Sequence, residues 1–398
     1  MEQNSIKKEN KKAVAWLALG HGMADCYSGF INPILPFIVA KIGITLGIAT
    51  CALSISQLFS SMMQPVFGFI ADKWRKRFFI FWGMLMASIF LSMTGIARNF
   101  VQLTLCLVIG GIGVGFYHPQ ATGLVAKYSG EHTTRDMSLF IASGTIGYSL
   151  GPVVSSGITG IWGLNKLPFA AIAGIIYAFL VFLCVPRVKK EEFVQNQKSF
   201  RTSLSDILKN KVVRLLIMVS ALKSLVTSGF SVLLPFLWKD MGYSAIQIGA
   251  VMFVFLTMGA VGTYLSSRFE KIVGYKKIFY VSLCVPFFLA ILFIYTLKTA
   301  PVLSFAVFVA IGFTTMLSMS VNMVLAQRTM PQYKSMISGF IGGFSWGIVG
   351  VMLPVIGFVA ERIGIPATLL IISGIPFVLS YLLRYLPDDI GNREKDGN

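Results

Sequence analysis

The chain has 398 residues, of which 55% are hydrophobic and only 13% are charged. Soluble globular domains carry about 25% charged residues, and the mean hydropathy here is +0.75. This composition excludes an ordinary soluble domain and indicates a protein whose solvent is lipid. The net charge of +18 does not indicate nucleic acid binding, because the basic residues stand in short clusters between long apolar runs. The expected partners are the lipid bilayer and a small-molecule substrate, with no nucleic acid.

The apolar runs have the length of membrane-spanning helices. About 20 apolar residues cross a bilayer core of roughly 30 Å, and the runs lack the two-residue alternation of barrel strands. The first run is too long for the apolar region of a signal peptide, so we expect it to be retained. We therefore predict an all-α integral membrane protein with twelve spans, at 13–40, 45–71, 78–97, 99–126, 136–162, 166–186, 212–238, 244–267, 277–297, 300–327, 335–360 and 365–386.

Loop charge predicts how the spans are oriented. If both termini are cytoplasmic, only six of the 34 Lys and Arg residues lie in outside loops, as the positive-inside rule requires. The six outside residues are Lys41, Arg98, Lys166, Lys239, Lys298 and Arg362. We predict a multi-pass protein of the inner membrane of a bacterial-type cell, with both termini in the cytoplasm.

A polar segment at 187–211 divides the predicted spans into two sets of six. The two halves share short sequences: Ser28-Gly29-Phe30 recurs as Ser228-Gly229-Phe230, and Leu35-Pro36-Phe37 recurs as Leu234-Pro235-Phe236. Two related six-helix units are typical of transporters that rock about a site at the bilayer midplane. No feature indicates dimerisation, so a monomer is expected. We predict an N-tail at 1–12, pseudo-symmetric six-helix bundles at 13–186 and 212–386, a linker at 187–211 and a C-tail at 387–398.

Only two charged side chains fall well inside the predicted spans, Asp25 in the first and Lys223 in the seventh. Placing either in a bilayer costs at least about 2.5–3.5 kcal/mol on insertion scales, so such residues usually face an interior cavity and serve a function. The two spans are matching helices of the two halves. We expect both side chains to border one central, water-accessible cavity; the alternative is a structural ion pair.

The histidines indicate where a proton is handled. His21 lies one helical turn before Asp25, and Ser28 and Asn32 continue the same narrow face. Histidine changes charge near physiological pH, and a neighbouring carboxylate favours its protonated form. We predict that His21 and Asp25 take up and release a coupling proton. His118, which precedes a proline, is predicted to be a second relay or a gate; the alternative is a hydrogen-bonded packing histidine.

Further polar residues lie at helical spacing on several spans, and we expect them to line the cavity. For Ser and Thr the alternative is ordinary helix packing. The predicted substrate-binding residues are Asn32, Gln57, Gln64, Gln120, Lys223, Thr227, Asn322 and Trp346.

The loop between the second and third spans reads Gly68-Phe-Ile-Ala-Asp72-Lys73-Trp-Arg75-Lys76-Arg77. It resembles the loop motif of the major facilitator superfamily, in which a glycine precedes an aspartate and a basic cluster. The resemblance implies the major facilitator fold and a latch that holds one conformation. The usual glycine before the last basic pair is Arg75 here. The alternative is anchoring by the positive-inside rule alone. The predicted motif residues are Gly68, Asp72, Lys73, Lys76 and Arg77.

The fifth span carries Gly144-x-x-Gly147-x-x-x-Gly151-Pro152. This pattern is similar to the glycine–proline motif of facilitator-family exporters. Small residues let helices approach closely and a proline bends a span. Gly147, Gly151 and Pro152 are therefore predicted conformational residues, with generic helix packing as the alternative.

Two more stretches resemble the fosmidomycin-resistance branch of that superfamily. One is Gly20-His21-Gly-Met-Ala24-Asp25 with a following Leu-Pro pair, and the other is Gly115-Phe-Tyr-His118-Pro119-Gln120. The chain departs from the branch at Ala24, where an asparagine is usual, and at Gln120, where an acid is usual. The resemblance implies efflux of small drug-like or anionic compounds.

The expected function is that of a proton-coupled antiporter that exports a small drug-like or anionic compound by alternating access. The chain has no phosphate-binding loop, metal-ligand spacing or catalytic triad context, so it is not expected to be an enzyme. No cofactor and no metal are expected, and a proton gradient would supply the energy. The alternatives are a proton symporter or facilitator that imports a small organic anion, and a lipid flippase or non-transporting membrane receptor.

Overall fold

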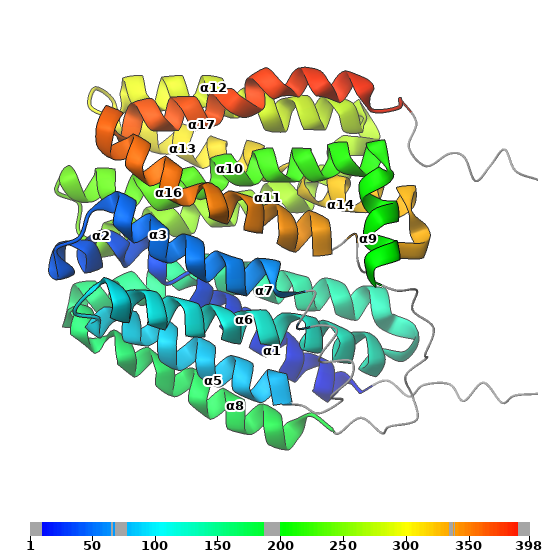
Figure 1. Ribbon diagram of the computed structural model, residues 1–398, viewed down its shortest axis with the longest axis horizontal. Coiled ribbons are helices and arrows are strands. Elements are labelled where there is room, and N and C mark those ends of the chain that lie inside the picture. The colour runs from blue at the N-terminus through cyan, green and yellow to red at the C-terminus, as the bar shows by residue number, and fades with distance from the viewer. Residues whose placement is uncertain are drawn as a thin grey trace, which may run out of the picture. The chain divides into compact units, whose positions relative to one another are not determined.

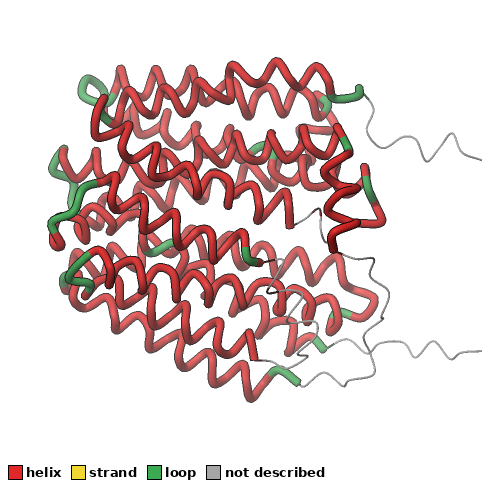
Figure 2. Tube along the Cα trace, in the orientation of Figure 1, coloured by secondary structure: helices red, strands yellow, loops and turns green. Residues whose placement is uncertain are grey.

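The computed structural model describes residues 10–64, 67, 78–186, 200–333, 337 and 339–388. Every regular element within these ranges is a helix (Figure 2). Eleven described helical segments are long and apolar enough to cross a membrane, and Leu46–Met62 is a shorter apolar helix. The architecture agrees with the predicted all-α membrane protein. Most of the predicted second span beyond Gln64 lies outside the described residues.

The described residues form two compact units. The first takes its residues from Met1–Phe193 and Trp238–Phe253, and the second from Val194–Leu237 and Val254–Asn398. The predicted boundaries of the tails, bundles and linker stay a prediction.

The first unit contains the first six predicted spans (Figure 1). Side-chain caps mark several of its helix starts: Asn10, Thr45 and Asn99 each accept a hydrogen bond from a backbone N–H of the first turn. The elements are α1 (Lys11–Ser28), α2 (Ile31–Ile42), α3 (Leu46–Gln57), the π-helical η1 (Leu58–Met62), α5 (Phe78–Met93), η2 (Thr94–Ile96), α6 (Phe100–Tyr128), η3 (Gly130–His132), α7 (Thr133–Trp162), η4 (Leu164–Ala170) and α8 (Ala171–Cys184).

The first span is interrupted where the sequence predicted one continuous helix. α1 ends at Ser28 and α2 begins at Ile31. Pro33 has no N–H to offer the carbonyl of Gly29 four residues earlier, and its ring crowds that carbonyl. Gly29 itself lies so close to α7 that a Cβ would come within 2.6 Å of the Tyr148 carbonyl oxygen. The matching Ser228-Gly229-Phe230 has no proline at the equivalent place, and its helix is unbroken.

The second unit contains the other six predicted spans, and helix α9 precedes them within the predicted linker. The elements are α9 (Phe200–Lys209), α10 (Lys211–Asp240), α11 (Ala245–Val273), α12 (Tyr275–Thr296), α13 (Pro301–Met316), α14 (Met319–Thr329), η6 (Pro331–Tyr333), the π-helical η7 (Gly339–Phe344), α16 (Ser345–Ile363), α17 (Ile365–Leu379) and η8 (Ser380–Tyr385). The C-terminal end of α10 and the start of α11 count with the first unit.

Helix α9 packs against other helices of the second unit. Ile207 is fully buried in an apolar cluster that includes Leu325, Met330 and Leu386. The Tyr333 hydroxyl donates a 2.6 Å hydrogen bond to the Asp206 carboxylate. Helix α9 is therefore held at the end of the second unit that carries η6.

Candidate functional site

The predicted proton pair lies on α1, in the interior of the first unit. The His21 Nε2 atom is 3.3 Å from Oδ2 of Asp25. The His21 residue is 8% exposed and the Asp25 side chain 20%, so both are shielded while the carboxylate keeps some access. The one-turn spacing read from the sequence thus places the two groups in contact.

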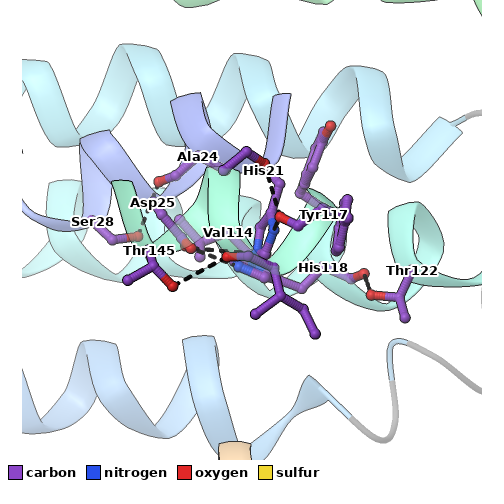
Figure 3. Close-up of polar contacts among 12 residues, drawn as sticks. His21, Ala24, Asp25, Ser28, Val114, Tyr117, His118, Thr122 and Thr145 are labelled. Carbon is purple, nitrogen blue, oxygen red and sulfur yellow. Dashed lines mark hydrogen bonds and ion pairs between the residues drawn. The ribbon is translucent and has the colours of Figure 1, made fainter. Parts of the chain in front are cut away.

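His118, which the sequence predicted as a second relay or a gate, joins this pair from α6. Its contact with Asp25 was not predicted. Its Nε2 atom lies 2.9 Å from Oδ1 of Asp25, and Figure 3 shows the two imidazoles converging on one carboxylate. The ring centroids of His21 and His118 are 4.9 Å apart and the rings are nearly perpendicular. The two carboxylate oxygens therefore contact different rings, so that three titratable groups form one site. We call these three residues the His–Asp–His cluster.

Backbone carbonyls accept hydrogen bonds from both imidazole rings, at the nitrogen that faces away from Asp25. Nδ1 of His21 donates to the Phe140 carbonyl at 2.7 Å, and Nδ1 of His118 donates to the Val114 carbonyl at 2.8 Å. The Phe140 ring also stacks on His21, with centroids 4.0 Å apart and planes 14° apart. These contacts fix both ring orientations, because each imidazole is held at one nitrogen and presents the other to Asp25.

The glycine motif of the fifth span makes room for the cluster. A Cβ on Gly144 would lie 2.4 Å from Cε1 of His21 and 2.6 Å from Oδ2 of Asp25. A Cβ on Gly147 would meet the Gly22 carbonyl, and one on Gly151 would come within 2.4 Å of the Cys26 carbonyl oxygen. The motif therefore seats α7 directly against α1. The predicted conformational role of Gly147, Gly151 and Pro152 stays a prediction.

Two buried tyrosines tie α6 and α8 to α1 beside the cluster. The Tyr117 hydroxyl donates to the Leu17 carbonyl at 3.0 Å and lies 3.1 Å from the Tyr177 hydroxyl. Tyr177 donates to the Trp16 carbonyl at 2.7 Å. Sequence reasoning missed both residues, since a tyrosine in an apolar span gives no signal of its own.

Lys223 lies on α10 in the interior of the second unit and is 1% exposed. Its Nζ atom lies 4.0 Å from the sulfur of Met316. Among the described residues no carboxylate forms an ion pair with it. In this conformation an anion reaches the ammonium only after neighbouring side chains move.

Three more of the predicted substrate residues are buried: Thr227 on α10, Asn322 on α14 and Gln120 on α6. Thr227 donates to the Lys223 carbonyl at 3.1 Å. Asn322 is fully buried; its amide donates to the Leu216 carbonyl at 2.9 Å, and its Oδ1 atom has no partner among the described residues. Gln120 is also buried, and its Oε1 atom accepts from the Ile80 backbone N–H at 2.8 Å, which caps the start of α5.

The remaining predicted substrate residues are half-buried. Ser60, which lies within the π-helical η1, donates to Oε1 of Gln57 at 2.9 Å. Gln64 donates to the Ser60 carbonyl at 2.8 Å, so Gln57 and Gln64 flank η1. Such π-helical turns are frequent at functional sites. Asn32 and Trp346 are half-buried on α2 and α16. The predicted loop residues Gly68, Asp72, Lys73, Lys76 and Arg77 lie outside the described residues.

The ligand atoms of the His–Asp–His cluster lie close together. One nitrogen or carboxylate oxygen atom from each of the three residues lies within 4.8 Å of the others. The expected absence of a cofactor and of a metal stays a prediction. A carboxylate flanked by two imidazoles can bind protons, and the net charge of the cluster changes as protons bind and dissociate.

Comparison with known proteins gives the family. The profile of the Major Facilitator Superfamily matches residues 17–354. The chain is 28% identical over 389 residues to the fosmidomycin resistance protein of Escherichia coli K12, covering 96% of this chain and 93% of that protein. It is 26% identical over 389 residues to the multidrug resistance protein MdtG of Klebsiella pneumoniae, covering 93% and 92%.

Solved structures give the same answer for the fold. The nucleoside transporter NupG superposes with a TM-score of 0.73 at 16% identity, covering 94% of this chain and 98% of that one. At this identity the likeness shows the fold alone. The superposition covers nearly the whole of both chains, in agreement with the predicted major facilitator fold. With the family profile spanning most of its length, this chain belongs to the major facilitator superfamily: it is a multi-pass secondary transporter of small molecules and not an enzyme.

Proposed function

We propose that this transporter is a proton-coupled antiporter that exports a small drug-like or anionic organic compound by alternating access. It would work as a monomer in the inner membrane of a bacterial-type cell, with both termini in the cytoplasm. The observation that carries the proposal is the His–Asp–His cluster, in which Asp25 contacts His118 at 2.9 Å and His21 at 3.3 Å.

The cluster supplies the chemistry that coupling requires. A lone carboxylate inside a membrane is costly, and a proton shared with an imidazole cancels its charge. The charge of the cluster therefore depends on which side of the membrane the site faces and on the pH of that side. Competition between protons and substrate for the region of Asp25 would then link the inward flow of protons to the outward flow of substrate. The two halves would rock about a midplane site.

The environment of Lys223 supports a substrate that carries an anionic group. Its ammonium is buried, and no described carboxylate neutralises it. Transferring such a charge out of water is unfavourable without a partner, and a carboxylate, phosphate or phosphonate group of a substrate would provide one. The names of the relatives, a fosmidomycin resistance protein and a multidrug resistance protein, support export of such compounds.

Flux measurements in vesicles test the proposal. Purified protein is reconstituted into liposomes with an imposed pH gradient, and the uptake of radiolabelled fosmidomycin is followed together with the internal pH. For the wild type we expect the substrate to enter liposomes with an acidic interior as protons leave them. Asp25→Asn should reduce gradient-driven flux to the level of protein-free liposomes. The matched control is Asp240→Asn, which removes an exposed acid at the end of α10 and should leave flux unchanged.

The same measurement separates the alternatives. A symporter moves substrate and protons in the same direction, so the sign of the response to the gradient reverses. A facilitator equilibrates the substrate without accumulation at any gradient. A receptor binds the compound without flux, and a flippase moves labelled lipid between the leaflets. Full gradient-driven exchange in Asp25→Asn would remove Asp25 from the coupling role.

A further inference from the structure

The hydrogen-bond partners of the two imidazoles determine where their protons sit. Nδ1 of His21 faces the Phe140 carbonyl at 2.7 Å, and Nδ1 of His118 faces the Val114 carbonyl at 2.8 Å. A peptide carbonyl has no proton to donate and can only accept. Both Nδ1 atoms must therefore carry a hydrogen, whatever the charge of the ring. In a neutral ring the other nitrogen, Nε2, is then bare.

Each bare Nε2 atom faces a different oxygen of the same carboxylate. The contacts are 2.9 Å from His118 to Oδ1 and 3.3 Å from His21 to Oδ2 of Asp25. With no proton between them, a nitrogen lone pair and an oxygen lone pair repel each other at such distances. A proton on the nitrogen turns the same contact into a charge-assisted pair. Each of the two contacts thus calls for its own proton.

We propose that the His–Asp–His cluster holds both imidazoles as Nδ1–H tautomers and takes up two exchangeable protons, one at each Nε2–carboxylate contact. Its net charge then runs from −1 through 0 to +1 as the first and second protons arrive. Each uptake forms one N–H bond and moves one proton from water, with no other reactant. That both protons move in one transport cycle rests on the proposed proton coupling, whereas the tautomers and the count of sites do not.

The surroundings leave these three residues as the groups that titrate near neutral pH. In the part of the chain that the structure describes, the other titratable side chains within electrostatic reach of Asp25 are Cys26 on α1, Tyr117 on α6 and Tyr148 on α7. The Tyr177 hydroxyl of α8 lies 3.1 Å from the Tyr117 hydroxyl, and α5 carries no titratable side chain. Thiols and phenols ordinarily ionise at about 8.5 and 10, so none of these competes for protons at physiological pH.

The two-proton arrangement can be observed without knowing the substrate. The chain has three histidines, and His132→Gln removes the exposed third one, so ¹⁵N-histidine labelling reports only His21 and His118. Full-length protein is treated with EDTA, placed in lipid bilayers and studied by solid-state ¹⁵N NMR from alkaline to acidic pH. Single variants His21→Asn and His118→Asn assign the signals.

At alkaline pH we expect both rings to show a protonated Nδ1 and a bare Nε2, although free histidine in water favours the opposite tautomer. On acidification both rings should become imidazolium, a gain of two protons per chain. An Nε2–H tautomer in either ring, or only one ring becoming charged, would overturn the inference. So would one bound metal per chain after EDTA treatment with both Nε2 atoms coordinated to it.

This outcome is separate from the fate of the proposed function. If both tautomers and both protonations are observed while Asp25→Asn still exchanges substrate against a pH gradient, the two-proton site stands and the proposed coupling falls. If transport in Asp25→Asn is lost but either ring is an Nε2–H tautomer, the coupling stands and the two-proton site falls.

Discussion

Asp25 and Lys223 are both buried charges, but their neighbours differ. Asp25 contacts two imidazoles from two helices, so protons can cancel its charge within the site. Lys223 has a methionine sulfur at 4.0 Å and no ion pair among the described residues. This difference supports the proposal that the first residue handles the proton and that the second binds the charged group of a substrate.

Lys223→Met should make the empty transporter more stable and worse at moving anions. Removing a buried, unpaired charge should raise stability by about 1–3 kcal/mol, since insertion scales place its cost at about 2.5–3.5 kcal/mol. A lost charge-assisted hydrogen bond of about 1.5–3 kcal/mol should raise the apparent Km for fosmidomycin about tenfold or more. Thermal unfolding and vesicle uptake measure the two effects.

The control for this substitution is Lys298→Met, at an exposed position after α12, which should change neither quantity. An uncharged fluorescent compound should be affected less than fosmidomycin. Equal losses for the charged and uncharged compounds would show that Lys223 has a structural role.

At the level of helices, the contact between α1 and α7 decides whether the cluster can form. Gly144 leaves no space for a methyl group beside His21 and Asp25. Gly157 lies farther along the same helix, and a Cβ there would meet nothing within 4 Å. Gly157 is therefore a matched control for Gly144, because it lies on the same helix but in open space.

Gly144→Ala should push α7 away from the cluster and lower both stability and gradient-driven flux. Overpacking of a tight contact costs about 1–3 kcal/mol, and the displaced Phe140 carbonyl would no longer hold His21. Gly157→Ala should leave flux intact and unfold no earlier than the wild type, because alanine is the better helix former. Normal flux in Gly144→Ala would show that the close approach is dispensable for function.

The docking of α9 is a second property of the helices. Tyr333→Phe removes the hydrogen bond to Asp206 while keeping the ring. We expect amide hydrogen exchange in residues 204–210 to become several-fold faster, because local opening of α9 then breaks fewer contacts. Tyr295→Phe is the control, since that side chain is 76% exposed on α12. Unchanged exchange in Tyr333→Phe would mean that burial of Ile207 alone holds the helix.

For the whole molecule, the distribution of basic residues predicts the orientation in the membrane. Alkaline phosphatase fused after Lys298 should be active, because that position lies in a predicted outside loop, and the same enzyme fused after Lys277 should be inactive. Green fluorescent protein at the C-terminus should fluoresce, as it does in the cytoplasm. The reverse pattern would invert the proposed direction of transport relative to the proton gradient.

Much of this arrangement follows from local properties of the chain. Hydropathy and length predict the spans to within a few residues, as in α6, predicted at 99–126 and observed at Phe100–Tyr128. Helical periodicity alone brings His21 beside Asp25, since residues four apart share a helix face. The break in the first span was missed, although Pro33 signals it.

The rest depends on how the helices pack. His118 reaches Asp25 across 93 residues of sequence, and the Phe140 carbonyl reaches His21 across 119. Spacing within one helix says nothing about which helices become neighbours; that depends on how closely their surfaces fit, here on glycines that let α7 approach α1. The contact between His21 and Asp25 could therefore be predicted from a single helix. His118 was predicted to handle a proton, but its contact with Asp25 and the carbonyls that orient both rings emerged only from the folded chain.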